Sequence, residues 1–126
     1  MKKNKQILII DDSSTNNLLC KMLFEDEGYN VILTENSCCA LKKLKKNTPD
    51  IILLDINLPD EDGFSVLNKL RTEKDTQNIP IVMVTARDDR QSYLRAKELG
   101  ATEYVTKPIG THKLFSKVEN ILKKAV

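Results

Sequence analysis

The stretch IILLD at residues 51–55 decides the fold, because four consecutive apolar residues run directly into the carboxylate of Asp55. Two more apolar quartets, ILII at 7–10 and IVMV at 81–84, are equally continuous. Strands with this continuous pattern are buried on both faces, as in a parallel sheet covered by helices. The three quartets therefore predict three fully buried strands of such a sheet.

Two weaker strands and five helices complete the pattern. The strands are predicted at 31–33 and 104–105. Apolar residues recur at helical spacing in five segments, which contain Leu18, Leu19, Met22 and Leu23; Ala40, Leu41 and Leu44; Phe64, Leu67 and Leu70; Ala96 and Leu99; and Leu114, Val118, Ile121, Leu122 and Ala125. Five repetitions of strand then helix predict right-handed crossovers and a (βα)5 doubly wound α/β fold with a five-stranded parallel sheet.

The first helix has more apolar residues than one buried face requires. We assign Leu19, Met22 and Leu23 to the core face of this helix. Leu18 and Cys20 then fall at positions expected to be exposed.

Length, composition and charge indicate an ordinary globular protein. The chain has 126 residues, 40% hydrophobic and 30% charged, without an internal repeat or linker, which predicts one domain over residues 1–126 with its core at about 6–123. No apolar run approaches the ~20 residues of a membrane helix, so no membrane insertion is expected. Because five of the lysines lie at the two chain ends, the segment 7–122 is mildly acidic and direct nucleic-acid binding is not expected.

The three cysteines match no zinc or dithiol redox motif. Cys20, Cys38 and Cys39 have neither a C-x-x-C spacing nor a His/Cys zinc spacing, and their number is odd. Adjacent cysteines also have poor geometry for an ordinary disulfide. The pattern is typical of reduced thiols in a cytoplasmic protein.

Polar residues follow the predicted strands at the points where they end. Asp11 and Asp12 follow the first strand, Asp55 the third, Thr85 the fourth and Lys107 the fifth. Parallel strands bring their carboxyl ends to one edge, where ligands bind. Three carboxylates need a cation, and hard oxygen donors suit Mg²⁺. A carboxylate can accept a phosphoryl group, and a lysine and a threonine nearby could bind that group's oxygens. The set therefore predicts a Mg²⁺-dependent aspartyl-phosphate site.

Each residue of this set also has a purely structural interpretation. Asp11 and Asp12 could cap the first helix, Thr85 could end a strand, and Lys107 with Pro108 could form a turn. Taken together, the residues resemble the receiver domain of two-component response regulators, from about 6 to 123. The resemblance is carried by Asp11-Asp12, Asp55-Ile-Asn-Leu-Pro59 through Asp62-Gly63, Thr85-Ala86 and Lys107-Pro108. It implies a chemotaxis-regulator-like, flavodoxin-like fold with strand order 2-1-3-4-5.

The resemblance implies a role for each acidic residue. Asp55 would accept the phosphoryl group from a sensor histidine kinase or a histidine phosphotransfer domain. Asp12 and Asp55 would bind Mg²⁺, or Mn²⁺ in its place, with the backbone carbonyl of Asn57. Asp11 would hold the metal through water. The only catalysis implied is the chain's own phosphorylation and dephosphorylation, so it would be a signalling phosphoacceptor and not an enzyme acting on other substrates.

The resemblance also implies how the phosphoryl group is held. Lys107 and Thr85 would contact its oxygens, and the backbone N–H groups of Asn57 and Ala86 would complete the site. The bond to Pro108 would be cis. Asn57 and Arg87 would tune the rate of hydrolysis.

Phosphorylation would then switch a surface. Thr85 would move toward the phosphoryl group and Tyr104 would turn into the vacated space, remodelling the surface of the fourth helix, fifth strand and fifth helix for a downstream protein or output domain. The first helix and the site mouth would dock on the phosphodonor. An acidic loop, Asp60-Glu61-Asp62, is expected to make that mouth more acidic.

Three other functions remain open at this point. A haloacid-dehalogenase-type phosphatase would need a second Asp where Asn57 stands. A flavodoxin-like FMN binder would need a phosphate-binding loop after the first strand, where Asp11 and Asp12 would repel phosphate without a metal. A pseudo-receiver would act as an interaction scaffold without phosphorylation, which the complete acidic set disfavours.

Overall fold

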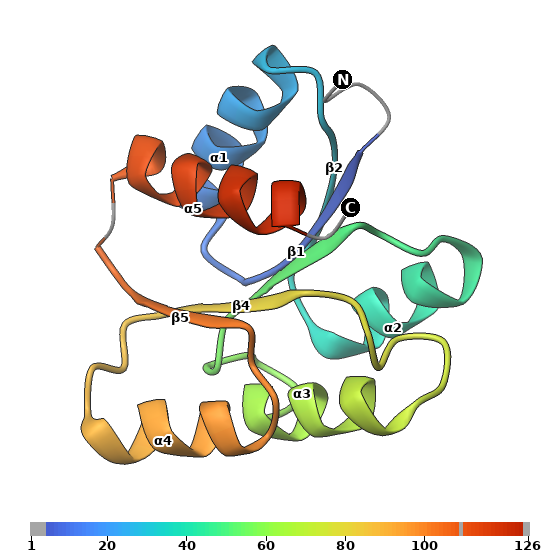
Figure 1. Cartoon of the computed structure of the whole chain (residues 1–126), viewed down its shortest axis with the longest axis vertical. Helices are drawn as coiled ribbons and strands as arrows, with labels where there is room; N and C mark the ends of the chain where they lie inside the picture. Colours follow the sequence, from blue (N-terminus) through green and yellow to red (C-terminus); the bar gives the residue numbers. More distant parts are fainter. Residues whose placement is uncertain (1–4, 109, 125–126) are drawn as a thin grey trace.

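A computed structural model describes residues 5–108 and 110–124 of the chain. Its five strands form one sheet in the order β2-β1-β3-β4-β5, and all four neighbouring pairs are parallel, which confirms the predicted topology (Figure 1). The strands are β1 (Gln6–Ile10), β2 (Asn30–Thr34), β3 (Ile51–Leu54), β4 (Ile81–Thr85) and β5 (Glu103–Thr106). The helices are α1 (Ser14–Asp26), α2 (Ser37–Lys46), α3 (Gly63–Thr72), α4 (Arg90–Glu98) and α5 (Thr111–Lys124).

The helices cover both faces of the sheet and create two separate cores. Helices α1 and α5 lie on one face, and α2, α3 and α4 lie on the other (Figure 1). Alternate residues of β3 divide between these cores, since Ile52 packs in the α2–α4 core and Leu53 in the α1–α5 core. The continuous apolar quartets are therefore buried on both sides, as their pattern predicts.

The core face of α1 differs from the prediction. Leu19 and Met22 are 52% and 57% exposed, whereas Phe24 is fully buried against Tyr29 and Phe115. Leu18 is exposed as expected. The assignment of Leu19 and Met22 to the core was wrong, because the rings of Phe24, Tyr29 and Phe115 fix which side of the helix faces the sheet.

Cys20 also departs from its expected position. It is half-buried and packs against the α1–α5 core instead of lying at an exposed position. Ala125, the last residue of the predicted α5 stripe, lies outside the described residues.

Arg71 joins three segments on the α3–α4 side. Its guanidinium donates hydrogen bonds to the carbonyl oxygens of Gly100 (2.8 Å), Gln77 (3.0 Å) and Ile79 (2.6 Å). Gly100 has a φ of +102° and stands against the Arg71 side chain. This one side chain therefore fixes the end of α3, the loop before β4 and the turn after α4.

Within the described part of the chain, no helix is both long and apolar enough to span a membrane.

Candidate functional site

The site lies where the two central strands end. Ile10 and Leu54 are register partners in β1 and β3, so the residues that follow them, Asp11 and Asp55, emerge side by side. The N–H of Asp55 donates to the carbonyl of Ile10 (2.9 Å), which continues the sheet one residue beyond the strands. The convergence of the two carboxylates is thus a direct consequence of parallel pairing.

Lys107 connects these two carboxylates from the end of β5. Its Nζ is 2.7 Å from Oδ2 of Asp11 and 3.1 Å from Oδ2 of Asp55. Burial acts to lower the pKa of Lys107, but the hydrogen bond to Asp11 and the charges of Asp11 and Asp55 outweigh it, so its pKa is raised. Lys107 therefore stays an ammonium ion and offsets part of the negative charge.

Three carboxylates make up the acidic cluster. One oxygen each from Asp11, Asp12 and Asp55 lies within 4.8 Å of the others. Asp11 and Asp55 are buried, while Asp12 is exposed. Burial raises the pKa of Asp11, and its hydrogen bond from Lys107 only partly opposes that rise. An oxygen-only donor set that holds more negative charge than Lys107 offsets fits a hard divalent cation.

Backbone and side-chain groups hold Asp11 in place from α1. Its Oδ1 accepts from the N–H of Ser13 (2.9 Å). The buried side chain of Asn17 donates from Nδ2 to the carbonyl of Asp11 (2.5 Å). Asn17 is not among the site residues predicted from the sequence, because its positioning role depends on the turn between β1 and α1.

Asp55 is positioned by the loop that follows it. Its Oδ1 accepts from the N–H of Asn57 (3.2 Å). Gly63, at the start of α3, donates its N–H to the carbonyl of Ile56 (2.7 Å). A Cβ on Gly63 would overlap the carbonyl of Asp55 and come within 2.5 Å of Cα of Ile56. Glycine is therefore required for α3 to approach the end of β3 this closely.

Thr85 and Tyr104 each form a hydrogen bond with the backbone of Arg87. Oγ1 of the fully buried Thr85 accepts from the N–H of Arg87 (3.4 Å). The hydroxyl of Tyr104 donates to the carbonyl of the same residue (2.6 Å). The Tyr104 ring is half-buried and meets Tyr93 of α4 edge to face, with 5.6 Å between ring centroids. The backbone of Arg87 thus connects the end of β4 with Tyr104 of β5, and the ring of Tyr104 contacts α4.

The remaining predicted site residues are Asn57, Ala86, Arg87 and Pro108. Asn57 and Ala86 are exposed, and the Lys107–Pro108 peptide bond is cis, as the resemblance implies. The guanidinium of Arg87 lies over the ring of Phe64, 5.6 Å from its centroid.

The acidic loop of Asp60 and Glu61 is joined to α2 and α3. Asp60 accepts hydrogen bonds from the backbone N–H groups of Ser37 (3.0 Å) and Cys38 (3.1 Å) at the start of α2. Glu61 accepts from the Ser37 hydroxyl (2.8 Å) and pairs with Lys69 (2.6 Å). These carboxylates therefore bind α2 and α3, and hydrogen bonds from these helices lower the pKa of both groups, so their negative charges are kept. That they make the site mouth more acidic stays a prediction.

A small cavity adjoins the acidic cluster on the α1–α5 side. It has a volume of about 90 Å³, with Leu53 and Val84 among its apolar walls and Lys107 at its polar end. Cys20 also lines it, and burial raises the pKa of this thiol.

Comparison with known proteins gives one consistent family. Residues 7–119 match the model of the response regulator receiver domain. The chain is 38% identical over 122 residues to the alkaline phosphatase synthesis transcriptional regulatory protein PhoP of Bacillus subtilis, covering 97% of this chain and 50% of PhoP. The chain therefore spans half the length of that relative.

Solved structures that resemble this chain are response regulators as well. A two-component response regulator from Clostridium difficile superposes with a TM-score of 0.91 at 34% identity, covering 97% of this chain and 98% of that chain. The Mn²⁺-bound form of response regulator Rcp1 superposes with a TM-score of 0.81 at 28% identity, covering 93% and 91%.

Proposed function

Because the chain belongs to the family of response regulator receiver domains, we propose that Asp55 accepts a phosphoryl group from the phosphohistidine of a two-component partner. One observation carries this proposal. Asp55 shares a cation, Lys107, with a second buried carboxylate, and its other oxygen accepts from a backbone N–H. A carboxylate held in this way presents an oxygen to an incoming phosphorus atom. The family assignment argues against the phosphatase and flavin-binding alternatives.

We propose Mg²⁺ as the metal of the acidic cluster. Asp12 and Asp55 would bind it directly, the backbone carbonyl of Asn57 would contribute a third protein ligand, and Asp11 would act through water. The oxygen-only donors, with one exposed carboxylate, fit a cation that keeps part of its water shell. When bound, the metal would offset the charge of the carboxylates and of the transferred phosphoryl group.

The chain's own residues hold the phosphoryl group in this proposal. Lys107 exchanges its contact with Asp55 for a phosphoryl oxygen, which places its charge where negative charge accumulates. Thr85 and the backbone N–H groups of Asn57 and Ala86 donate to the remaining oxygens. Asn57 and Arg87 flank the group and set its lifetime, so Arg87→Ala is expected to change that lifetime; an unchanged lifetime would remove Arg87 from this role.

We propose that the output is a change in the α4-β5-α5 surface. Thr85 moves toward the phosphoryl group, and the shared Arg87 backbone carries this movement to Tyr104. The contact between Tyr104 and Tyr93 extends it to α4. A two-state element of this kind requires only that the new charge favours one arrangement.

We propose two kinds of partner, one that delivers the phosphoryl group and one that responds to the changed surface. A sensor histidine kinase or histidine phosphotransfer domain would dock on α1 and the site mouth, and a protein or output domain would read the α4-β5-α5 surface. We propose that residues 1–126 act as one receiver domain. The three unpaired cysteines support a cytoplasmic location.

Intact-protein mass spectrometry tests the proposal. Incubation with Mg²⁺ and acetyl phosphate is expected to add one phosphoryl group to the wild type and none to Asp55→Asn. Chelation of the metal should abolish the adduct, whereas Asp75→Asn, which changes an exposed loop carboxylate, should retain it. An adduct on Asp55→Asn would refute Asp55 as acceptor. Absence of any adduct, also with a phosphorylated histidine domain as donor, would favour a phosphorylation-independent scaffold.

A further inference from the structure

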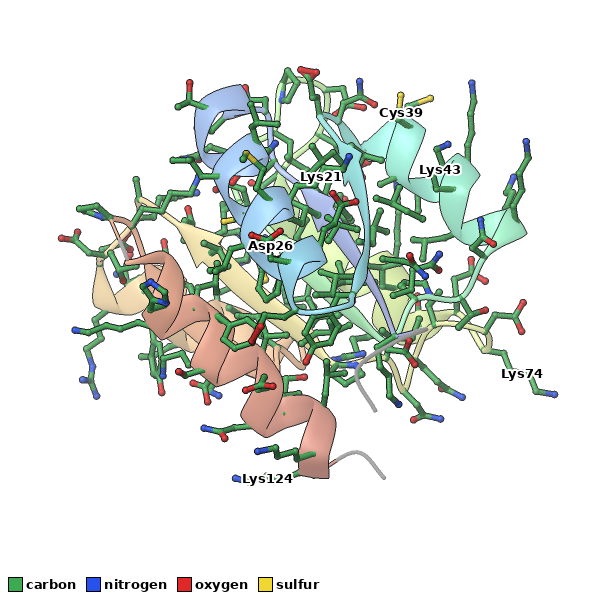
Figure 2. The ribbon with its side chains drawn as sticks, turned by 90° about the horizontal axis from the view of Figure 1, so that it is seen from above. Lys21, Asp26, Cys39, Lys43, Lys74 and Lys124 are labelled. Atoms are coloured by element: carbon green, nitrogen blue, oxygen red, sulfur yellow. The ribbon has the colours of Figure 1, made fainter. Side chains whose placement is uncertain are left out.

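Two adjacent thiols lie outside the phosphoacceptor site, in the first turn of α2. Cys38 and Cys39 are both exposed, and Cys39 lies at the start of the helix with its side chain directed away from the body of the molecule (Figure 2). The third cysteine, Cys20 of α1, is half-buried. The pair is therefore accessible to a reagent in solution in a way that Cys20 is not.

Helix geometry disfavours a direct bond between these two thiols. Consecutive Cα atoms are about 3.8 Å apart, which is shorter than the ~4.4–6.8 Å found across disulfides. Neighbouring side chains on a helix also do not face each other. A direct disulfide between Cys38 and Cys39 is thus disfavoured, whereas one atom inserted between the two sulfurs closes a larger and less strained ring.

The number of available thiols, two, limits which element can bridge Cys38 and Cys39. A structural zinc ion requires four ligands. Among the described residues, the one group of three or more potential metal ligands is Asp11, Asp12 and Asp55, which does not include these cysteines. A trivalent arsenic centre carrying one organic group needs only two thiols to complete its bonding, and two exposed adjacent thiols are what this chain provides.

We propose that Cys38 and Cys39 form a dithiol site for a trivalent arsenic centre, and that Asp60 connects this site to the loop after Asp55. The reaction is a condensation. Two S–H bonds and the arsenic–oxygen bond of an organoarsenic oxide break, two arsenic–sulfur bonds form, and one water molecule leaves with both protons. Arsenic remains trivalent, so no oxidant or reductant is required.

The proposed connection between the dithiol site and Asp60 depends on hydrogen bonds at the N-terminus of α2. The N–H of Cys38 donates to Oδ2 of Asp60 (3.1 Å), and the N–H of Cys39 donates to Oδ1 of Asn36 (2.8 Å). Ser37 donates its N–H to Oδ1 of Asp60 (3.0 Å). Joining both sulfurs to one atom must turn the two side chains toward each other. The first turn of α2 then distorts, and Asp60 loses the geometry that holds its loop.

Phenylarsine oxide and intact-protein mass spectrometry test the site. One adduct is expected on the wild type and on Cys20→Ser, with the mass of the reagent less one water. It should survive excess 2-mercaptoethanol and be removed by 2,3-dimercaptopropanol, because only a dithiol competes with two bonds. Cys38→Ser and Cys39→Ser should each lose the resistant adduct. A resistant adduct on the Cys38→Ser/Cys39→Ser double variant, or its loss on Cys20→Ser, would overturn the site.

Amide hydrogen exchange tests the connection without using phosphorylation. The adduct on Cys20→Ser is expected to remove protection from the N–H groups of Ser37 and Cys38 and to speed exchange in residues 56–63. The double variant treated with the same reagent provides the control, and α5 provides an internal reference. Unchanged exchange at residues 56–63 in the adduct would overturn the connection through Asp60.

Discussion

In the acidic cluster, the ammonium group of Lys107 lies between two buried carboxylates of the same charge. Its contacts with Asp11 and Asp55 span 96 and 52 residues of sequence. Without this cation, two negative charges at the sheet edge would repel each other with little water to screen them. Lys107 therefore stabilises the metal-free protein in addition to its proposed contact with the phosphoryl group.

We expect Lys107→Met to lower the free energy of unfolding of the metal-free protein by about 2 kcal/mol, because buried carboxylates lose their charged partner. Millimolar Mg²⁺ should recover part of this loss, since a cation bound at the cluster replaces the missing charge. Urea unfolding with and without Mg²⁺ measures both effects. Lys117→Met, which removes an exposed lysine from α5, serves as the control. Equal stability of the two variants without metal would contradict the argument.

At the scale of elements, the start of α3 lies directly against the end of β3. This approach depends on Gly63, whose missing side chain leaves room for the backbone of Asp55 and Ile56. Gly110, in the segment before α5, has no atom within 4 Å of the position where a Cβ would stand. The two glycines form a matched pair for separating steric contact from general effects of alanine.

We expect Gly63→Ala to destabilise the protein by roughly 1–3 kcal/mol, the usual cost of forcing extra atoms into a packed site. Phosphorylation of Asp55 by acetyl phosphate should also slow, because the backbone that positions the carboxylate must shift. Gly110→Ala should leave both properties close to wild type. Urea unfolding and the rate of mass gain provide the measurements, and a wild-type result for Gly63→Ala would refute the steric argument.

Helix α2 is joined to the loop after β3 by the carboxylate of Asp60. Asp60 accepts from the first N–H groups of α2, and these hydrogen bonds lower the pKa of Asp60, with the N–H of Ser37 as the largest cause. A carboxyl group whose pKa is lower in the folded state stabilises that state only while it is ionised. Its contribution is therefore complete above the unfolded pKa and lost as the pH falls through the folded pKa.

We expect Asp60→Ala to unfold at a lower urea concentration than wild type at neutral pH. The difference should stay constant down to about pH 4, near the ordinary Asp pKa, and shrink below it as wild-type Asp60 takes up a proton. Urea midpoints measured from pH 7 to pH 3 test this. Asp75→Ala, which removes an exposed carboxylate of another loop, should show no comparable difference. A difference independent of pH would exclude the charged cap.

At the scale of the whole molecule, α1 exposes an apolar strip beside the site mouth. Leu18, Leu19 and Met22 are 56%, 52% and 57% exposed. They lie within the first three turns of α1, which begins two residues after Asp12, so we expect a partner that reaches Asp55 from this side to meet them. Exposed apolar residues grouped in this way are typical of docking surfaces.

We expect the double variant Leu18→Ser/Met22→Ser to keep the wild-type stability within about 0.5 kcal/mol, as surface changes usually do. Its phosphorylation by acetyl phosphate should be unchanged, because a small donor needs no docking surface. Transfer from a phosphorylated histidine domain should slow through weaker binding. Parallel assays with the two donors separate these effects. An equal loss with both donors would show that the strip supports the site itself and not the partner.

Much of the fold could be predicted because the decisive residues act through local patterns. The quartet at 51–54 is apolar at every position, which is typical of a strand covered on both faces. Three site residues directly follow a strand: Asp11, Asp55 and Lys107. Parallel pairing of the strands alone therefore brings them to one edge of the sheet. For the same reason, the acidic cluster could be inferred without knowledge of any side-chain conformation.

Other features could not be predicted, because they depend on contacts between distant segments. The sequence of α1 offers more apolar residues than one face can bury, and the buried position of Phe24 is decided by the rings of Tyr29 and Phe115. Asp60 finds its partners Ser37 and Cys38 over 20 residues away only because α2 begins beside the loop after β3. The sequence by itself thus determined the sheet and its acidic edge through strand order, whereas tertiary packing decided which helix faces are covered and which loop carboxylates cap a helix.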